Sequence, residues 1–256
     1  MIAKTPAIVL RYAPSGETSR VVTWLTPRTG RIATVLKGAL RPKSGFLGQY
    51  DLFYTCELLY YRRPARQVYL AKECAPLKLR PAFRSDWRAT ALASYWTDLA
   101  ARVSPAHAPQ SSLYRWLELG LDTVLTAGPS IGLCGWLELQ LLRQLGLAPQ
   151  LTVCSGCQAA LPLGRPTVFS AARGGLLCAA CARHDRSEAL PVPADIQAIL
   201  QRWQQAATPE AALRIRCTAA QTAALNRILG AFLRYHLDLA LPSRQIALDI
   251  LQRGNP

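Results

Sequence analysis

Residues 52–61 have the sequence LFYTCELLYY, in which apolar side chains occupy every even position. The odd positions mix polar Thr55 and Glu57 with aromatic residues. Because successive side chains of a strand point to opposite faces of a sheet, this alternation predicts a strand with one buried face. The expected buried set is Leu52, Tyr54, Cys56, Leu58 and Tyr60.

Four similar runs, rich in β-branched and aromatic residues, flank this strand. They are residues 7–12, 20–26, 31–37 and 67–71, and Pro and Gly between them indicate turns. Five short strands within 80 residues predict a small barrel. For a barrel that binds nucleic acid, the expected architecture is the five-stranded OB-fold.

After residue 80 the apolar residues recur at three- and four-residue spacing, which predicts helices. The expected helices are residues 82–103, 111–126, 131–147, 194–206, 209–215 and 218–239. We therefore expect a multidomain α+β protein, with an OB-fold domain at 1–80 and a helical domain at 81–256. A segment rich in Gly, Pro and Cys, at about 150–192, interrupts the helical domain.

The 256 residues include 30 Lys and Arg against 15 Asp and Glu, and the net charge is +15. Residues 1–80 alone hold 14 of these cations and 4 of the acids. Such an excess of positive charge predicts an anionic partner. Nucleic acid is the first candidate and a membrane surface the second. With neither a signal peptide nor a transmembrane run in the sequence, we expect a cytoplasmic protein without a membrane partner.

The four cysteines Cys154, Cys157, Cys178 and Cys181 form two CxxC pairs separated by twenty residues. This spacing is typical of a tetrahedral site in which four thiolates hold one structural Zn²⁺. The alternatives are buried free cysteines, a redox pair, or replacement of one ligand by His184. The other cysteines, Cys56, Cys74, Cys134 and Cys217, have no partner spacing and are expected in the core.

A basic segment, Lys37-Gly38-Ala39-Leu40-Arg41-Pro42-Lys43-Ser44, leaves a predicted strand and enters a Gly-rich loop. Its cations are placed to meet successive phosphates of a nucleic acid. Other arginines extend the predicted track: Arg20, Arg28 and Arg31 before it, and Arg62, Arg63 and Arg66 after it. The alternative is an ordinary solvated charged face.

Motifs of nucleotide-driven or hydrolytic enzymes are absent from the sequence, including GxxxxGK[ST], HExxH and GxSxG. The sequence does not exclude a cysteine nucleophile whose base is a spatially adjacent His107, His184 or His236. We expect a protein without enzymatic activity and without a nucleotide cofactor.

Several motifs resemble those of the bacterial RecO recombination-mediator family. In the amino-terminal part they are Ile8-Val9-Leu10, Gly16-Glu17-Thr18-Ser19-Arg20-Val21-Val22, Leu25-Thr26 with Gly30, Lys37-Gly38-Ala39 and Arg41-Pro42-Lys43-Ser44. In the helical part they are Leu141-Leu142-Arg143, Leu145-Gly146-Leu147-Ala148-Pro149, the paired CxxC with Gly174-Gly175-Leu176-Leu177-Cys178, and Ser243-Arg244.

The resemblance implies an OB-fold joined to a helical domain with an inserted zinc element. It implies ATP-independent binding of single- and double-stranded DNA, annealing of complementary strands, and replacement of single-stranded-DNA-binding protein by the recombinase, with RecR as partner. By position, Lys37, Arg41 and Lys43 would contact DNA, and the four CxxC cysteines would hold zinc. Leu40 departs from the family, which often has a basic residue there.

The resemblance also implies that the acidic tail of single-stranded-DNA-binding protein docks on this protein. The expected docking site is an Arg-bearing groove between helices. Arg115 and Arg143 lie on predicted helices and are the candidates. Two other classes stay open: an RNA- or ribosome-associated OB-fold protein with a zinc ribbon, and an adaptor that holds other proteins.

Overall fold

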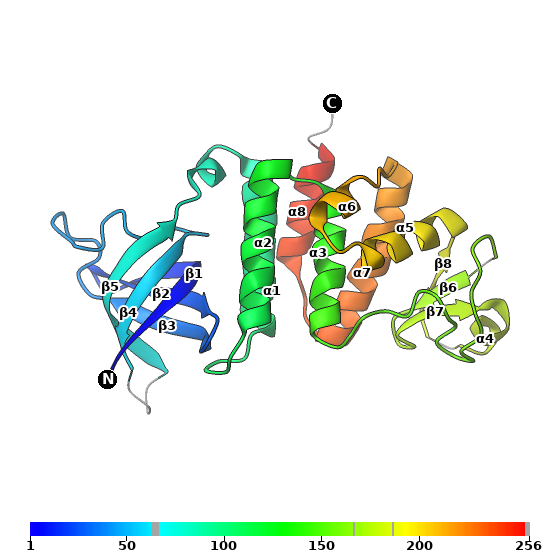
Figure 1. The fold of residues 1–256 in the computed structure, drawn as a ribbon, viewed down its shortest axis with the longest axis horizontal. Helices are drawn as coiled ribbons and strands as arrows, with labels where there is room; N and C mark the ends of the chain where they lie inside the picture. The colour runs from blue at the N-terminus through cyan, green and yellow to red at the C-terminus, as the bar shows by residue number, and fades with distance from the viewer. Residues whose placement is uncertain (63–66, 166, 186, 254–256) are drawn as a thin grey trace. The chain divides into compact units, whose positions relative to one another are not determined.

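The computed structural model describes residues 1–62, 67–165, 167–185 and 187–253 (Figure 1). The chain forms two compact units. The first comprises Met1–Gly128 together with Ser243–Pro256, and the second comprises Pro129–Pro242. The second unit is thus inserted in the sequence between two parts of the first.

The first unit begins with a closed five-stranded barrel, whose strand order is β1-β2-β3-β5-β4. Its strands are β1 (Ile2–Ser15), β2 (Ser19–Thr26), β3 (Gly30–Leu36), β4 (Thr55–Tyr61) and β5 (Val68–Lys78). The parallel pairing of β3 with β5 and the antiparallel pairing of β1 with β4 close the barrel. The predicted OB-fold is confirmed.

The barrel core contains the even-numbered set predicted from residues 52–61. Tyr54, Cys56, Leu58 and Tyr60 are buried in it, and Leu52 packs against it. The strand starts at Thr55, later than predicted, because Phe53 has a φ of 67° and the backbone turns there. Strand β5 continues past the predicted end at residue 71, and Pro76 is accommodated where the β4–β5 register shifts.

Helical elements complete the first unit: η1 (Pro81–Arg84), α1 (Trp87–Val103), α2 (Ser111–Ala127) and α8 (Pro242–Arg253). The predicted helix over 82–103 is divided because the Asp86 side chain accepts hydrogen bonds from the N–H groups of Arg88 and Ala89 and caps α1. Helix α8 was not predicted. Its Ser243 hydroxyl donates to Asp98 Oδ2 of α1 at 2.7 Å.

Arg80 connects the barrel to the helices of this unit. It is 2% exposed, and its guanidinium forms an ion pair with Asp122 of α2 at 2.8 Å. The same group donates to the Phe53 carbonyl at 2.5 Å and to Thr55 Oγ1 at 3.1 Å. One side chain therefore joins the end of β5, the start of β4 and helix α2.

The second unit is a group of helices with a small sheet. The group of helices consists of α3 (Ile131–Gln144), α5 (Ala194–Gln205), α6 (Pro209–Leu213) and α7 (Ala219–Leu237). Gly135 of α3 is in close contact with Trp203 of α5, because a Cβ there would lie 2.6 Å from the indole ring. The fit requires glycine.

The predicted insertion is a three-stranded sheet with the order β7-β6-β8. Its strands are β6 (Thr167–Ser170), β7 (Gly175–Cys178) and β8 (Ala189–Val192), and α4 (Ala179–His184) follows β7. Phe169 of β6 packs edge-on against Phe232 of α7 at a centroid distance of 5.5 Å. The insertion is therefore packed against the helices of its own unit.

The predicted domain boundary near residue 80 lies between β5 and η1 and stays a prediction. Helices α1, α2 and α8 belong to the same compact unit as the barrel. Among the described helices, none is both long enough and apolar enough to cross a membrane.

Replacing Arg80 by Leu is expected to lower the free energy of unfolding by about 3 kcal/mol, because Asp122 loses a partner and the Phe53 carbonyl loses its donor. Arg102 is the matched control, since it forms an exposed pair with Asp98 within α1. Arg102→Leu should cost under about 0.5 kcal/mol. Urea unfolding followed by circular dichroism measures both, and equal costs would contradict the role given to Arg80.

Candidate nucleic-acid interface and metal centre

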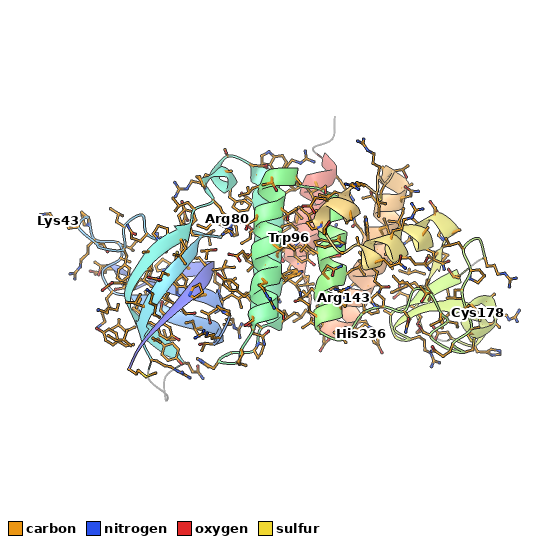
Figure 2. All side chains as sticks on the ribbon, viewed as in Figure 1. Lys43, Arg80, Trp96, Arg143, Cys178 and His236 are labelled. Carbon is orange, nitrogen blue, oxygen red and sulfur yellow. The ribbon has the colours of Figure 1, made fainter. Side chains whose placement is uncertain are left out.

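The β3–β4 loop (residues 37–54) carries the basic segment identified in the sequence. Lys37, Arg41 and Lys43 are all exposed. Figure 2 shows Lys43 at the outer end of this loop, away from the barrel. Across the described residues, none of these three cations forms an ion pair. Their charges are therefore available to an external anion.

The first half of the loop is built from consecutive turns. Arg41 N–H donates to the Gly38 carbonyl at 3.1 Å, and Ser44 N–H donates to the Arg41 carbonyl at 3.0 Å. Gly38 has a φ of 65°, a conformation that favours glycine. Leu40 N–H donates to the Thr18 carbonyl at 2.9 Å and joins the loop to the β1–β2 turn.

Asp51 fixes the second half of the loop. Its carboxylate accepts hydrogen bonds from Tyr12 Oη at 3.2 Å, Leu52 N–H at 2.8 Å and Arg84 Nη2 at 2.6 Å. Burial raises the pKa of Asp51, but the hydrogen bonds from Arg84 and Leu52 outweigh it and hold the pKa below its usual value. The Asp51 carboxylate is therefore ionised at neutral pH.

The structure gives two other predicted arginines contacts within the protein. The Arg20 guanidinium lies over the Tyr12 ring, 4.6 Å from its centroid. Arg31 Nη1 donates to the Ala101 carbonyl at 2.7 Å, near the carboxyl end of α1. Both are half-buried: Arg20 contacts a neighbouring strand of the barrel, and Arg31 joins the barrel to α1. Their predicted phosphate contacts stay predictions.

The remaining predicted cations lie apart from the loop or outside the described residues. Arg62 is exposed just after β4, whereas Arg63 and Arg66 lie outside the residues that the structure describes. Arg115 is exposed on α2 of the first unit, and Arg143 is exposed on α3 of the second. The proposed groove for a partner tail therefore stays a prediction.

The four CxxC cysteines come together, as predicted. Their sulfur atoms all lie within 4.8 Å of one another, and Cys157 Sγ is 3.9 Å from Cys178 Sγ. Tetrahedral coordination with metal–sulfur bonds of about 2.3 Å requires sulfur–sulfur separations of about 3.8 Å. The donor set thus fits a metal ion. Cys178, at the end of β7, is labelled in Figure 2.

Backbone hydrogen bonds prepare Cys154 to act as a ligand. Its sulfur accepts from Gly156 N–H at 3.4 Å and from Cys178 N–H at 3.3 Å. Burial raises the pKa of Cys154, but N–H groups of Cys178, Cys157 and Gly156 lower it to about 6. The thiolate, which is the form that binds metal, is therefore favoured at neutral pH.

The segment before the first CxxC pair lies against β7. Gln150 N–H donates to the Gly174 carbonyl at 2.9 Å, and Leu176 N–H donates to the Gln150 carbonyl at 2.9 Å. A Cβ on Gly175 would lie 2.2 Å from that Gln150 carbonyl. Glycine is required because the two backbones approach so closely. His184 is exposed and outside the sulfur cluster.

The sequence analysis did not identify Asp51, Arg80 or Arg84, which hold the end of the β3–β4 loop. Arg84 lies 33 positions from Asp51, and Arg80 lies 27 positions from Phe53. No local pattern relates residues at such separations. Only the barrel topology brings them together.

Both parts of the chain match one family of sequences. Residues 1–80 match the family model described as "Recombination protein O N terminal", and residues 84–245 match "Recombination protein O C terminal". A "DNA repair protein RecO" of Anaeromyxobacter dehalogenans (strain 2CP-1 / ATCC BAA-258) is 31% identical over 248 residues, which cover 97% of this chain and 96% of the relative.

Two further proteins of that name are similarly related. The one from Roseiflexus sp. (strain RS-1) is 33% identical over 238 residues, covering 93% of this chain and 82% of the relative. The one from Pelotomaculum thermopropionicum is 28% identical over 245 residues, covering 94% and 91%. The similarity therefore extends over nearly the whole chain.

Replacing Cys178 by Ser is expected to remove the bound metal and to lower the melting temperature, because three sulfurs leave the coordination incomplete. Cys217→Ser is the matched control, since Cys217 lies outside the sulfur cluster. Elemental analysis of the purified proteins measures metal per chain. Unchanged metal content in Cys178→Ser would contradict the four-cysteine site.

Proposed function

This chain belongs to the RecO family of DNA repair proteins, and we propose that it is an ATP-independent recombination mediator. It binds single- and double-stranded DNA, anneals complementary strands, and helps the recombinase replace single-stranded-DNA-binding protein. The observation that carries this proposal is the exposed β3–β4 loop of the OB-fold, whose Lys37, Arg41 and Lys43 have no ion-pair partner among the described residues.

Annealing by such a surface requires no reacting side chain. A cationic face that holds two strands reduces their mutual repulsion and raises their local concentration. Base pairing then supplies both specificity and driving force. We therefore infer a mediator that acts by binding alone, without catalysis and without a nucleotide cofactor.

The metal that we propose for Cys154, Cys157, Cys178 and Cys181 is Zn²⁺, one per chain. Thiolates are soft ligands that suit zinc, and four of them leave no coordination position for water or substrate. The ion would supply folding free energy to the inserted sheet. Its role is therefore structural, and the proposed chemistry on DNA does not pass through it.

The proposed partners are DNA, RecR and the acidic tail of single-stranded-DNA-binding protein. For the tail we retain Arg115 and Arg143 as candidate contacts, because both guanidinium groups are exposed on helices. The expected location is the cytoplasm, at the nucleoid. An RNA-directed function is the alternative, and competition between matched DNA and RNA oligonucleotides distinguishes the two.

The protein is expected to accelerate annealing of complementary strands that are precoated with single-stranded-DNA-binding protein, with no nucleotide added. Fluorescence energy transfer between labels on the two strands measures the rate. Repeating the rate measurement in the presence of a chelator tests whether zinc is needed for annealing or for structure alone. Unchanged annealing, with DNA still bound, would contradict the mediator function and favour a passive binding protein.

The double substitution Lys37→Ala with Lys43→Ala is expected to reduce the slope of log affinity against log salt by about 1 to 2, because one counterion fewer is released per lost phosphate contact. Lys4→Ala with Lys72→Ala is the matched control, since both lysines lie outside the predicted track and are already paired with Glu57 and Glu73. Fluorescence anisotropy with a single-stranded oligonucleotide measures the slope. An unaltered slope would exclude these lysines from phosphate contact.

A further inference from the structure

A shallow depression of about 350 Å³ lies where the β1–β2 turn meets the start of the β3–β4 loop. We propose that it binds one phosphodiester group of a nucleic-acid backbone through hydroxyl groups of the turn and cations of the loop. This inference rests on the proposed function. It adds ligands that the charge pattern did not identify and gives the strand a fixed point on the barrel.

Five of the seven residues that line the depression have side chains that can donate hydrogen bonds. Ser15, Thr18 and Ser19, at and beside the β1–β2 turn, line it together with Lys37 and Arg41 of the β3–β4 loop. Gly38 and Val35 complete the lining. A phosphodiester has one negative charge and accepts hydrogen bonds only, so this lining matches its chemistry.

Two hydrogen bonds join the β1–β2 turn to the start of the β3–β4 loop. Leu40 N–H donates to the Thr18 carbonyl at 2.9 Å, and Gly38 N–H donates to Ser19 Oγ at 3.2 Å. A hydroxyl that accepts a hydrogen bond keeps its own proton to donate. Ser19 is therefore positioned by the loop while its proton stays available to a ligand.

The electrostatics of the depression favour an anion. In the part of the chain that the structure describes, Lys37 and Arg41 take part in no ion pair, so an incoming phosphate displaces no carboxylate. Glu17 belongs to the same turn but is exposed and not part of the lining. Arg41 also lies against Gly38, where a Cβ would be 3.3 Å from Arg41 Cδ.

The lining indicates a backbone contact and not recognition of bases. It includes no aromatic ring, and Tyr54, Tyr60 and Tyr69 are buried in the barrel core. Phosphate contacts fix the position and orientation of a strand, whereas base contacts read its sequence. The depression therefore sets where the strand lies on the barrel without selecting a sequence.

The test removes hydroxyl groups without changing any charge. The full-length double variant Ser15→Ala with Thr18→Val is compared with Thr29→Val, which removes a hydroxyl from the β2–β3 turn at the other end of β2. Binding of a fluorescent dT20 oligonucleotide is measured by anisotropy over a range of salt concentrations. Thr18→Ser, which keeps the hydroxyl, serves as the rescue variant.

We expect the double variant to bind about tenfold more weakly, because two hydrogen bonds to a charged group are lost. Its slope of log affinity against log salt should equal that of the unmodified protein, since no cation has been removed. Thr29→Val and Thr18→Ser should retain unmodified affinity. Equal melting temperatures confirm that the variants are folded.

Three outcomes would overturn the proposal. Unmodified affinity in the double variant, with DNA still bound, excludes the hydroxyl contacts and leaves the proposed function intact. Failure of the unmodified protein to bind any oligonucleotide overturns the proposed function as well. Calorimetry with inorganic phosphate tests a free-phosphate site: a Kd below about 1 mM that is lost in the double variant would assign the depression to that ligand instead.

Discussion

A guanidinium that is removed from water must find partners for its N–H groups, because an unpaired buried charge costs several kcal/mol. Arg80 finds them in Asp122 of α2, the Phe53 carbonyl and Thr55 Oγ1. These partners belong to the start of β4 and to helix α2, and Arg80 itself follows β5. The buried charge of Arg80 therefore ties the barrel to α2, because its partners come from both.

The same constraint explains how an exposed loop can present charge at a defined place. The β3–β4 loop is fixed at its start by the hydrogen bond from Leu40 N–H to the Thr18 carbonyl. Its end is fixed by Asp51 and by the Arg80 contact to Phe53. The residues that hold the loop are thus distinct from the cations that it exposes. A substitution of one set need not disturb the other.

Local patterns predicted much of this structure. The alternation over residues 52–61 predicted the buried face of β4, and the CxxC spacing predicted the sulfur cluster, since both depend on neighbours in sequence. Contacts at long separation were not predictable in this way. The hydrogen bond from Arg31 to the Ala101 carbonyl, 70 positions away, is an example. Helix α8 was missed because the expected helical pattern ended at residue 239.

The first unit is made from both ends of the chain, with Met1–Gly128 joined by Ser243–Pro256. Helix α8 contributes the Ser243 hydrogen bond to Asp98, and Arg88 Nη2 donates to its Leu251 carbonyl at 3.3 Å. During synthesis on the ribosome, α1 therefore emerges long before these partners exist. All of Pro129–Pro242 is translated in between and can fold first. The first unit can thus be completed only after the whole of the second has been translated.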